Sequence, residues 1–413
     1  MKLKYFFISL LLISCTIANA QYYYTIDGIK YECTVAPAEA KVMSKSPSKY
    51  TGTIKIPSKV LVYNTTCKVV AIKQNTFLDC VGLTSVSIPN SITSIGASAF
   101  KNCVGLTSVE IPNSVTKIAE NTFDGCSSLT SVIIPSSVTS IADYAFRNCS
   151  ELKQIVIPES VVSIGNSAFE GCINLENIYF YSNPTIGTDA IPSTAKCQLM
   201  LDDSNATEFN TANANTYADV SYTRTISEGK YGTIILPFAP DAASLENYAF
   251  YKLTESSDDY MKFEEVLTPI ANTPYIYTLR EGKENIAITG GETTISSSIV
   301  TPEVDGWQTI GSFNNQTIDT SNGNYYALSA NDNEINRITK NLTVLPYRAY
   351  FKSVDASKSA LNIYISGTTG VEEILSSEID GFENGAIFDL CGRKVVEPTN
   401  GNIYIKNGKK IMF

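Results

Sequence analysis

A phenylalanine, and a cysteine three residues after it, return every 23 residues through the middle of this 413-residue chain. A unit of 23 residues cannot close a hydrophobic core alone, so each unit must stack on its neighbours to bury its apolar side. Several copies in one phase therefore predict a solenoid. The phenylalanines are Phe77, Phe100, Phe123, Phe146 and Phe169, and the cysteines are Cys80, Cys103, Cys126, Cys149 and Cys172.

Each repeat predicts a short strand followed by a turn. In the copy "LTSVEIP", the side chains of Leu106, Val109 and Ile111 are expected to point into the coil, while Glu110 faces outward. Pro112 then ends the strand, because proline has no backbone N–H to donate. The alternation predicts one buried and one exposed face for the stacked strands.

Repeats of the form "LTSVxIPxSVTxIxxxAFxxC" resemble the BspA-like, or treponemal-type, leucine-rich repeats of bacterial cell-surface proteins. The resemblance covers residues 76–192, and residues 21–75 resemble the N-terminal β cap that such proteins carry. In that cap Asp27-Gly28 predicts a hairpin turn, and Ile56-Pro57 predicts a first, widened rung. The resemblance implies an exported, non-enzymatic protein of Bacteroidales-type bacteria. Its implied partners are host extracellular or cell-surface proteins, or glycans.

The chain changes character after the repeats. Residues 193–221 are polar and predict a cap or linker. Residues 222–355 alternate strand-like runs with turns, which is typical of an antiparallel β-sandwich-like module. Residues 356–413 predict a small C-terminal β module with two hairpins, whose turns lie near Cys391-Gly392 and Asn407-Gly408. These residues resemble, loosely, sorting domains of the type IX secretion system. The fold class is therefore mainly β, with a solenoid of 23-residue repeats followed by two β modules.

The first 20 residues have the features of a secretory signal peptide, namely two lysines, an apolar run and Ala18-Asn19-Ala20 as a cleavage site. Cleavage after Ala20 is the favoured interpretation and predicts a secreted or cell-surface protein associated with the outer membrane. The alternative is a lipoprotein, because Leu12-Ile13-Ser14-Cys15 resembles a lipobox that would place a lipid anchor on Cys15. No other apolar run approaches the ~20 residues that a transmembrane helix needs.

Composition narrows the function classes. The chain has no histidine, which excludes Ser-His-Asp and Cys-His catalysis and histidine-ligated metal sites. A net charge of −10 argues against nucleic acid as a partner. Carboxylate pairs such as Glu264-Glu265 are adjacent on a predicted strand and would point apart. We therefore predict no catalytic residue, metal or cofactor, and an enzyme within residues 222–355 is the least favoured alternative.

The repeat cysteines have two interpretations. Stacked rungs would place the thiols ~4.8 Å apart, whereas a disulfide requires Cβ atoms ~3.5–4.5 Å apart and a dihedral near 90°. Packing as small hydrophobic residues is favoured over disulfide pairing, metal binding or redox function. The phenylalanines at one position of every repeat are expected to stack as a buried column inside the solenoid. Pairing of Cys33 with Cys67 in the cap stays open, because an exported protein permits disulfides.

The outward strand positions are the candidate binding surface. Ile133, Val156 and Tyr179 occupy the outward position of Glu110 in later repeats and would form an exposed apolar strip, which often marks a partner surface. Two alternatives compete, namely cross-strand pairs that only stabilise the sheet and cover by the C-terminal module. The function predicted is an adhesin or protein-binding scaffold, with a glycan-binding or structural envelope protein as the alternative. The predicted binding residues are Glu110, Ile133, Lys153, Gln154, Val156, Glu176, Asn177, Tyr179 and Tyr181.

Overall fold

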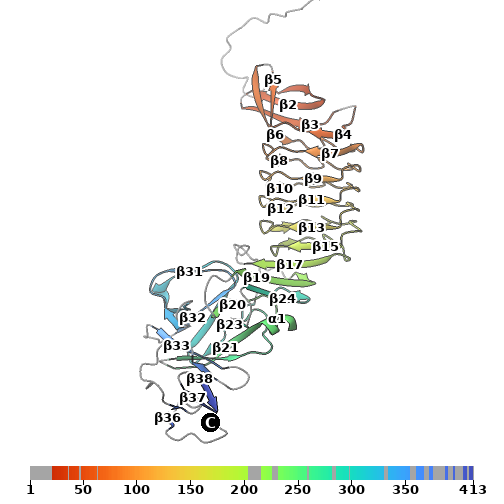
Figure 1. The fold of residues 1–413 in the computed structure, drawn as a ribbon. Coiled ribbons are helices and arrows are strands. Elements are labelled where there is room, and N and C mark those ends of the chain that lie inside the picture. The colour runs from red at the N-terminus through yellow and green to blue at the C-terminus, as the bar shows by residue number, and fades with distance from the viewer. Residues whose placement is uncertain are drawn as a thin grey trace, which may run out of the picture. The chain divides into compact units, whose positions relative to one another are not determined.

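The structure is a computed structural model, shown in Figure 1, and it divides into two compact units. The first unit comprises the chain up to Phe180 together with Pro184–Lys196. The second unit comprises Tyr181–Asn183 and Cys197–Phe413. From residue 367 onward the structure describes little beyond the strands. The described residues are 21–366 without 36, 46–47, 63, 203–214, 226–230, 258–259, 281–284, 297, 330–333 and 354–359, together with 372–374, 387–388, 394–395, 403–406 and 409–412.

A β-sheet caps the start of the first unit. Its first hairpin turns at Asp27 and Gly28, whose φ angles of 48° and 79° are the left-handed values that a two-residue turn of this kind requires. The predicted hairpin turn is confirmed. Cys33 and Cys67 are buried in this cap and both are free. The strand order is β1 (Tyr22–Ile26), β2 (Ile29–Val35), β3 (Ala38–Met43), β6 (Thr65–Ile72) and β5 (Lys59–Val62).

The repeats form a solenoid with one front strand and one return strand per rung (Figure 1). Two pairs of neighbouring front strands are parallel with a 23-residue offset, as in Ile133 opposite Glu110 and Tyr179 opposite Val156, and the return strands show the same offset in Ile141 opposite Ile118, so the predicted 23-residue solenoid is confirmed. The first rung is wider, because Ile54 pairs with Val86. The front strands are β4 (Gly52–Lys55), β7 (Leu83–Ser87), β9 (Ser108–Glu110), β11 (Ser131–Ile133), β13 (Gln154–Ile157) and β15 (Asn177–Phe180). The return strands are β8 (Ser94–Ile95), β10 (Lys117–Ile118), β12 (Ser140–Ile141), β14 (Ser163–Ile164) and β16 (Thr185–Ile186).

Each rung turns through two residues with left-handed φ angles. Asparagine, aspartate and glycine tolerate this conformation, which explains their frequency here. A side chain at Gly125 would also collide with the rung before it, since an added Cβ would lie 2.4 Å from Asn102 Oδ1. One turn column is Asn75, Ser98, Asn121, Tyr144, Ser167 and Asp189, and the other is Asp79, Asn102, Gly125, Asn148 and Gly171.

The phenylalanine column forms a stacked spine inside the solenoid. All its side chains are fully buried. Consecutive rings lie 4.9–5.4 Å apart at interplanar angles of 4–10°. Tyr50 extends the column into the cap, with its ring centroid 4.9 Å from that of Phe77. Its hydroxyl donates to the Met43 carbonyl and accepts from the Lys30 backbone N–H, so the aromatic column is anchored at its N-terminal end.

The second unit is built on an 11-stranded sheet with a core that includes Met261, Phe263, Trp307 and Phe351. The pairs of this sheet that lie within residues 222–355 are antiparallel, as expected, whereas β22 pairs in parallel with β33, a strand in the predicted C-terminal segment. The long chain between these two strands allows the crossover that a parallel pair needs. The order is β20 (Tyr231–Ile235), β23 (Pro274–Leu279), β21 (Tyr248–Ser256), β22 (Tyr260–Glu265), β33 (Ala360–Ser366), β30 (Glu334–Arg337), β29 (Asn324–Leu328), β32 (Arg348–Ser353), β27 (Trp307–Ser312) and β26 (Glu303–Val304), with β34 (Glu372–Ile374) beside β33.

Three shorter groups of elements also belong to the second unit. The helix α1 (Ala242–Asn247) is capped by Asp241, whose carboxylate accepts from the Ser244 backbone N–H. The pair β28 (Gln316–Ile318) and β31 (Leu342–Val344) flanks the 3-10 turn Thr320–Asn322. At the C-terminal end lie β35 (Ile387–Phe388), β36 (Lys394–Val395), β37 (Ile403–Lys406) and β38 (Lys409–Met412), which pair antiparallel.

The described part of residues 193–221, the segment predicted as a polar cap or linker, includes strands. It contains β17 (Lys196–Asp202), β18 (Thr216–Tyr217) and the start of β19 (Asp219–Thr225). Leu199 and Leu201 alternate with polar residues and are buried, which is the period-2 pattern of a half-buried strand. The polar residues between the strands obscured this pattern. β19 pairs with β17 in parallel and with β24 (Asn285–Gly290) antiparallel, while β18 pairs with β25 (Thr293–Thr294).

Several predicted features lie outside the described residues. These are the signal peptide, Cys15, and the hairpin turns near Cys391-Gly392 and Asn407-Gly408. Within the residues that are described, none of the helices has the length and apolar character needed to cross a membrane.

Candidate binding surface

The outward positions of three adjacent front strands carry large apolar side chains. Ile133 on β11 is 59% exposed and Val156 on β13 is 49% exposed, while Tyr179 on β15 is half-buried. Val156 and Tyr179 are register partners, and Ile133 is the partner of Glu110 on β9, which is exposed. We call Ile133, Val156 and Tyr179 the apolar strip. At the ~4.8 Å spacing of neighbouring strands it extends about 10 Å along the sheet.

Polar residues border the apolar strip on the same strands. Lys153, Gln154 and Glu176 are exposed, and Asn177 is half-buried opposite Gln154. Tyr181, the ninth predicted residue, directly follows β15 and belongs to the second compact unit. The apolar strip and its border can bury apolar area against a partner and offer hydrogen bonds around it, and they contain no catalytic arrangement.

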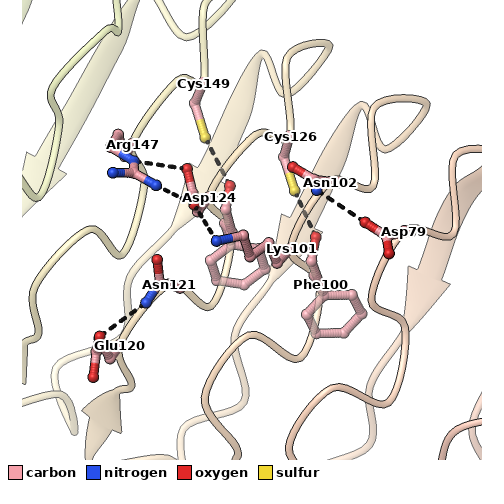
Figure 2. A network of polar contacts seen from close by, with 11 residues as sticks. Asp79, Phe100, Lys101, Asn102, Glu120, Asn121, Asp124, Cys126, Arg147 and Cys149 are labelled. Atoms are coloured by element: carbon pink, nitrogen blue, oxygen red, sulfur yellow. Dashed lines mark hydrogen bonds and ion pairs between the residues drawn. The ribbon is translucent and has the colours of Figure 1, made fainter.

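A buried carboxylate joins three rungs at the turn next to the phenylalanine column (Figure 2). The Asp124 side chain is 3% exposed and lies 3.0 Å from Lys101 Nζ. Arg147 donates to the same carboxylate from Nε at 3.1 Å and from Nη2 at 2.8 Å. Burial raises the pKa of Asp124, but the hydrogen bonds from Arg147 and Lys101 outweigh burial and hold the pKa below its ordinary value. This triad therefore stays charged at neutral pH.

This triad was not predicted, although the sequence contains a pattern that indicates it. The four residues that follow the phenylalanines from Phe100 onward alternate in charge, as Lys101, Asp124, Arg147 and Glu170. A 23-residue offset places each next to its opposite on the neighbouring rung. If the stacking skipped one repeat, residues of like charge such as Lys101 and Arg147 would become neighbours. The alternation of charge therefore also favours the correct stacking.

Comparison with known proteins agrees with the repeat geometry. Residues 70–197 match, in six copies, the family model described as "BspA type Leucine rich repeat region". These residues form a BspA-type leucine-rich repeat region. Among curated proteins, none matches the chain.

Several solved structures are similar to part of the chain. A leucine-rich repeat protein from Bacteroides ovatus is 28% identical with a TM-score of 0.38, and the match covers 45% of this chain and 57% of that one. A leucine rich cell surface protein from Faecalibacterium prausnitzii is 23% identical with a TM-score of 0.27, covering 45% and 72%. The leucine-rich repeat protein of T. pallidum is 24% identical with a TM-score of 0.33, covering 42% and 83%.

The cysteines of the BspA-type repeats are free, buried and hydrogen-bonded. Each thiol from the second repeat onward donates to the carbonyl of the phenylalanine 26 residues earlier, as in Cys126 Sγ to the Phe100 oxygen at 3.1 Å (Figure 2). Cys103 and Cys149 make the same bond at 3.0 Å and 3.3 Å. The thiol thus fills space in the core and also supplies a weak donor to a backbone acceptor.

We expect these thiols to be inert in the folded protein. Burial raises the pKa of Cys126 to about 12, so almost no thiolate, the reactive form, exists at pH 8. Iodoacetamide at pH 8 should leave the repeat cysteines unmodified in the native chain and label them in 8 M urea, as read by peptide mass spectrometry. Rapid native labelling of Cys103, Cys126 or Cys149 would contradict this prediction.

Among the described residues, no three histidine, cysteine, aspartate or glutamate side chains lie close enough together to hold a metal ion. Of the pair Glu264-Glu265, Glu265 accepts a hydrogen bond from Arg280 at 2.7 Å, while Glu264 is about half exposed.

Proposed function

We propose that the protein is an exported cell-surface binding protein whose BspA-type repeats contact a macromolecular partner through the apolar strip, without catalysis of its own. The observation that carries the proposal is a change from polar to apolar residues along the column of outward strand positions that contains Glu110. Ser87 and Glu110 occupy its first positions, whereas Ile133, Val156 and Tyr179 follow on adjacent rungs. Isolated exposed apolar residues are ordinary, but a contiguous group with a polar rim often marks a partner surface.

The chemistry of the border supports a protein partner over a membrane. Lys153 and Glu176 place both signs of charge beside the apolar strip, and the chain as a whole carries −10. An anionic bilayer selects basic surfaces, so it fits poorly. A protein surface with an apolar centre and a mixed polar rim fits well, because protein interfaces have this composition. Residues 1–20, with the features of a signal peptide, support a location outside the cytoplasm.

The test is a binding screen of residues 21–413 against host matrix proteins and mucins. We expect a dissociation constant of ~10 μM or tighter for at least one of them, about −7 kcal/mol. Changing Ile133, Val156 and Tyr179 together to serine should weaken that binding at least ten-fold, because the apolar centre of the contact is lost. Biolayer interferometry gives the affinities, and circular dichroism checks that the variant is folded.

The chain offers a matched control. Val81, Val104 and Ile173 are exposed by 60%, 39% and 73% on the turns of the same repeats. Changing these three to serine removes a similar apolar area from another surface of the same unit, and binding should be retained. Equal loss in both variants, or no binding by the parent to any matrix protein or mucin at this concentration, would refute the proposal that the apolar strip is the contact.

A further inference from the structure

Tyr144 occupies a turn position that disfavours a bulky side chain. Its φ angle is 58°, in the left-handed region that large residues rarely adopt. The equivalent positions on the two neighbouring rungs hold Asn121 and Ser167, so the turn itself does not require a ring. Strained residues of this kind are concentrated at functional sites. The fold alone therefore does not account for the ring at position 144.

The ring of Tyr144 is held in place by the buried triad. The guanidinium carbon of Arg147 lies 4.6 Å from the ring centroid, which is cation–π distance. Arg147 is itself fixed by two hydrogen bonds to Asp124 (Figure 2). The aromatic group is thus oriented before any ligand arrives, which reduces the entropy lost on binding.

Two hydrogen-bonding groups of the Tyr144–Arg147 pair remain open. Within the described part of the chain, the Tyr144 hydroxyl and Arg147 Nη1 make no hydrogen bond. Asp143 precedes the tyrosine, and its carboxylate accepts from the backbone N–H of Asn166 at 2.8 Å and from the Asn166 side-chain amide at 3.4 Å. The Asn166 side-chain oxygen accepts from the backbone N–H of Thr188 at 2.9 Å. The position of Asp143 is occupied on the preceding rung by Glu120, and the position of Arg147 is occupied on the following rung by Glu170. Both of these acids are exposed. We call Tyr144, Arg147, Asp143, Asn166, Glu120 and Glu170 the Tyr144 turn.

We propose that the Tyr144 turn binds a neutral saccharide ring. The C–H face of a pyranose can stack on the tyrosine, while its hydroxyls donate to carboxylates and accept from the guanidinium. An anionic ligand would meet the three acids, whereas Arg147, whose charge is paired with Asp124, offers its remaining N–H groups as donors. A neutral ligand rich in hydroxyl groups can accept from those donors and donate to the carboxylates. The site lies on the turns rather than on the front strands, so it is independent of the apolar strip.

Saturation-transfer NMR on residues 21–413 tests the proposal with defined probes. These are the methyl glycosides of glucose, galactose, mannose and N-acetylglucosamine, with N-acetylneuraminic acid and trilysine as charged probes. At least one neutral glycoside should bind with a dissociation constant in the millimolar range. Tyr144→Asn should weaken it at least ten-fold and should not lower the melting temperature, because asparagine fits the left-handed conformation. Tyr144→Phe, which retains the ring, should change the affinity less than three-fold.

Two controls show whether saccharide binding belongs to the Tyr144 turn. Ser167→Asn introduces asparagine at the equivalent position on the next rung and should leave the affinity unchanged. The serine variant of the apolar strip should also retain saccharide binding, so failure of one proposal is distinguishable from failure of the other. Absence of a signal from every neutral glycoside at about 10 mM would overturn the inference. So would full binding by Tyr144→Asn, or a signal from the charged probes alone.

Discussion

Replacing Phe123 with alanine is expected to lower the free energy of unfolding by about 3–5 kcal/mol. The ring lies in the middle of the spine, with the rings of Phe100 and Phe146 at 5.4 Å and 5.3 Å on its two sides. Removing it leaves a cavity between two rungs that the rigid stacking cannot collapse. Urea denaturation followed by far-UV circular dichroism measures the change.

The effect of Phe123→Ala should also be local in origin. Because each repeat contacts only its neighbours, hydrogen exchange should quicken first in the rungs on either side of position 123. Ile133→Ala is the matched control, since that side chain is 59% exposed and its loss should change the free energy of unfolding by less than about 0.5 kcal/mol. A change below about 1 kcal/mol for Phe123→Ala would show that the spine does not hold the repeats together.

The solenoid was predictable because one constraint repeats along the chain. The 23-residue period sets the register, and the alternation in each front strand sets which side chains are buried, so Val109 and Ile155 lie in the core while Glu110 and Val156 face out. Each repeat has the same sequence pattern and so predicts the same local structure, and the agreement among the repeats supports the prediction. The orientation of the candidate binding residues on the front strands could therefore be derived, with only Tyr181 falling in the second unit.

Features that occur once were harder to derive. Tyr50 continues the aromatic column, but it lies 27 residues before Phe77 instead of 23 and so falls outside the period. The parallel pairing of β22 with β33 joins Tyr260 to Asn362, and no local pattern indicates a partner so distant in sequence. β17 was hidden because a strand of seven residues flanked by polar segments gives a weak signal.

The triad at Asp124 illustrates a different limit. Charged residues on a turn are ordinarily solvated, so the alternation of Lys101, Asp124 and Arg147 carries little weight in a sequence until the turn is known to be stacked. Burial of the Asp124 carboxylate to 3% exposure is a consequence of that stacking. The same holds for Tyr144, whose left-handed backbone cannot be recognised before the turn column is aligned with its neighbours.

Asp124→Asn should destabilise the protein by about 2–3 kcal/mol at pH 7, because it leaves two cations without their shared counter-charge. Breaking a fully buried pair costs about 3–5 kcal/mol, and the side chains of Lys101 and Arg147 are each 31% exposed, so water offsets part of the loss. Urea denaturation at a series of pH values is the measurement. Asp79→Asn is the control, since Asp79 is half exposed and its 3.9 Å contact with Lys49 should contribute below 1 kcal/mol.

The pH dependence separates a charge effect from a packing effect. The pKa of Asp124 is lower in the folded state than the ordinary value of about 3.9, so its contribution to stability is fully present above that value and is lost as the pH falls through the folded-state pKa. The gap between the parent and Asp124→Asn should thus be constant from pH 7 to about pH 5 and should narrow below pH 4. A gap that persists unchanged at pH 3 would mean that shape, and not charge, makes Asp124 stabilising.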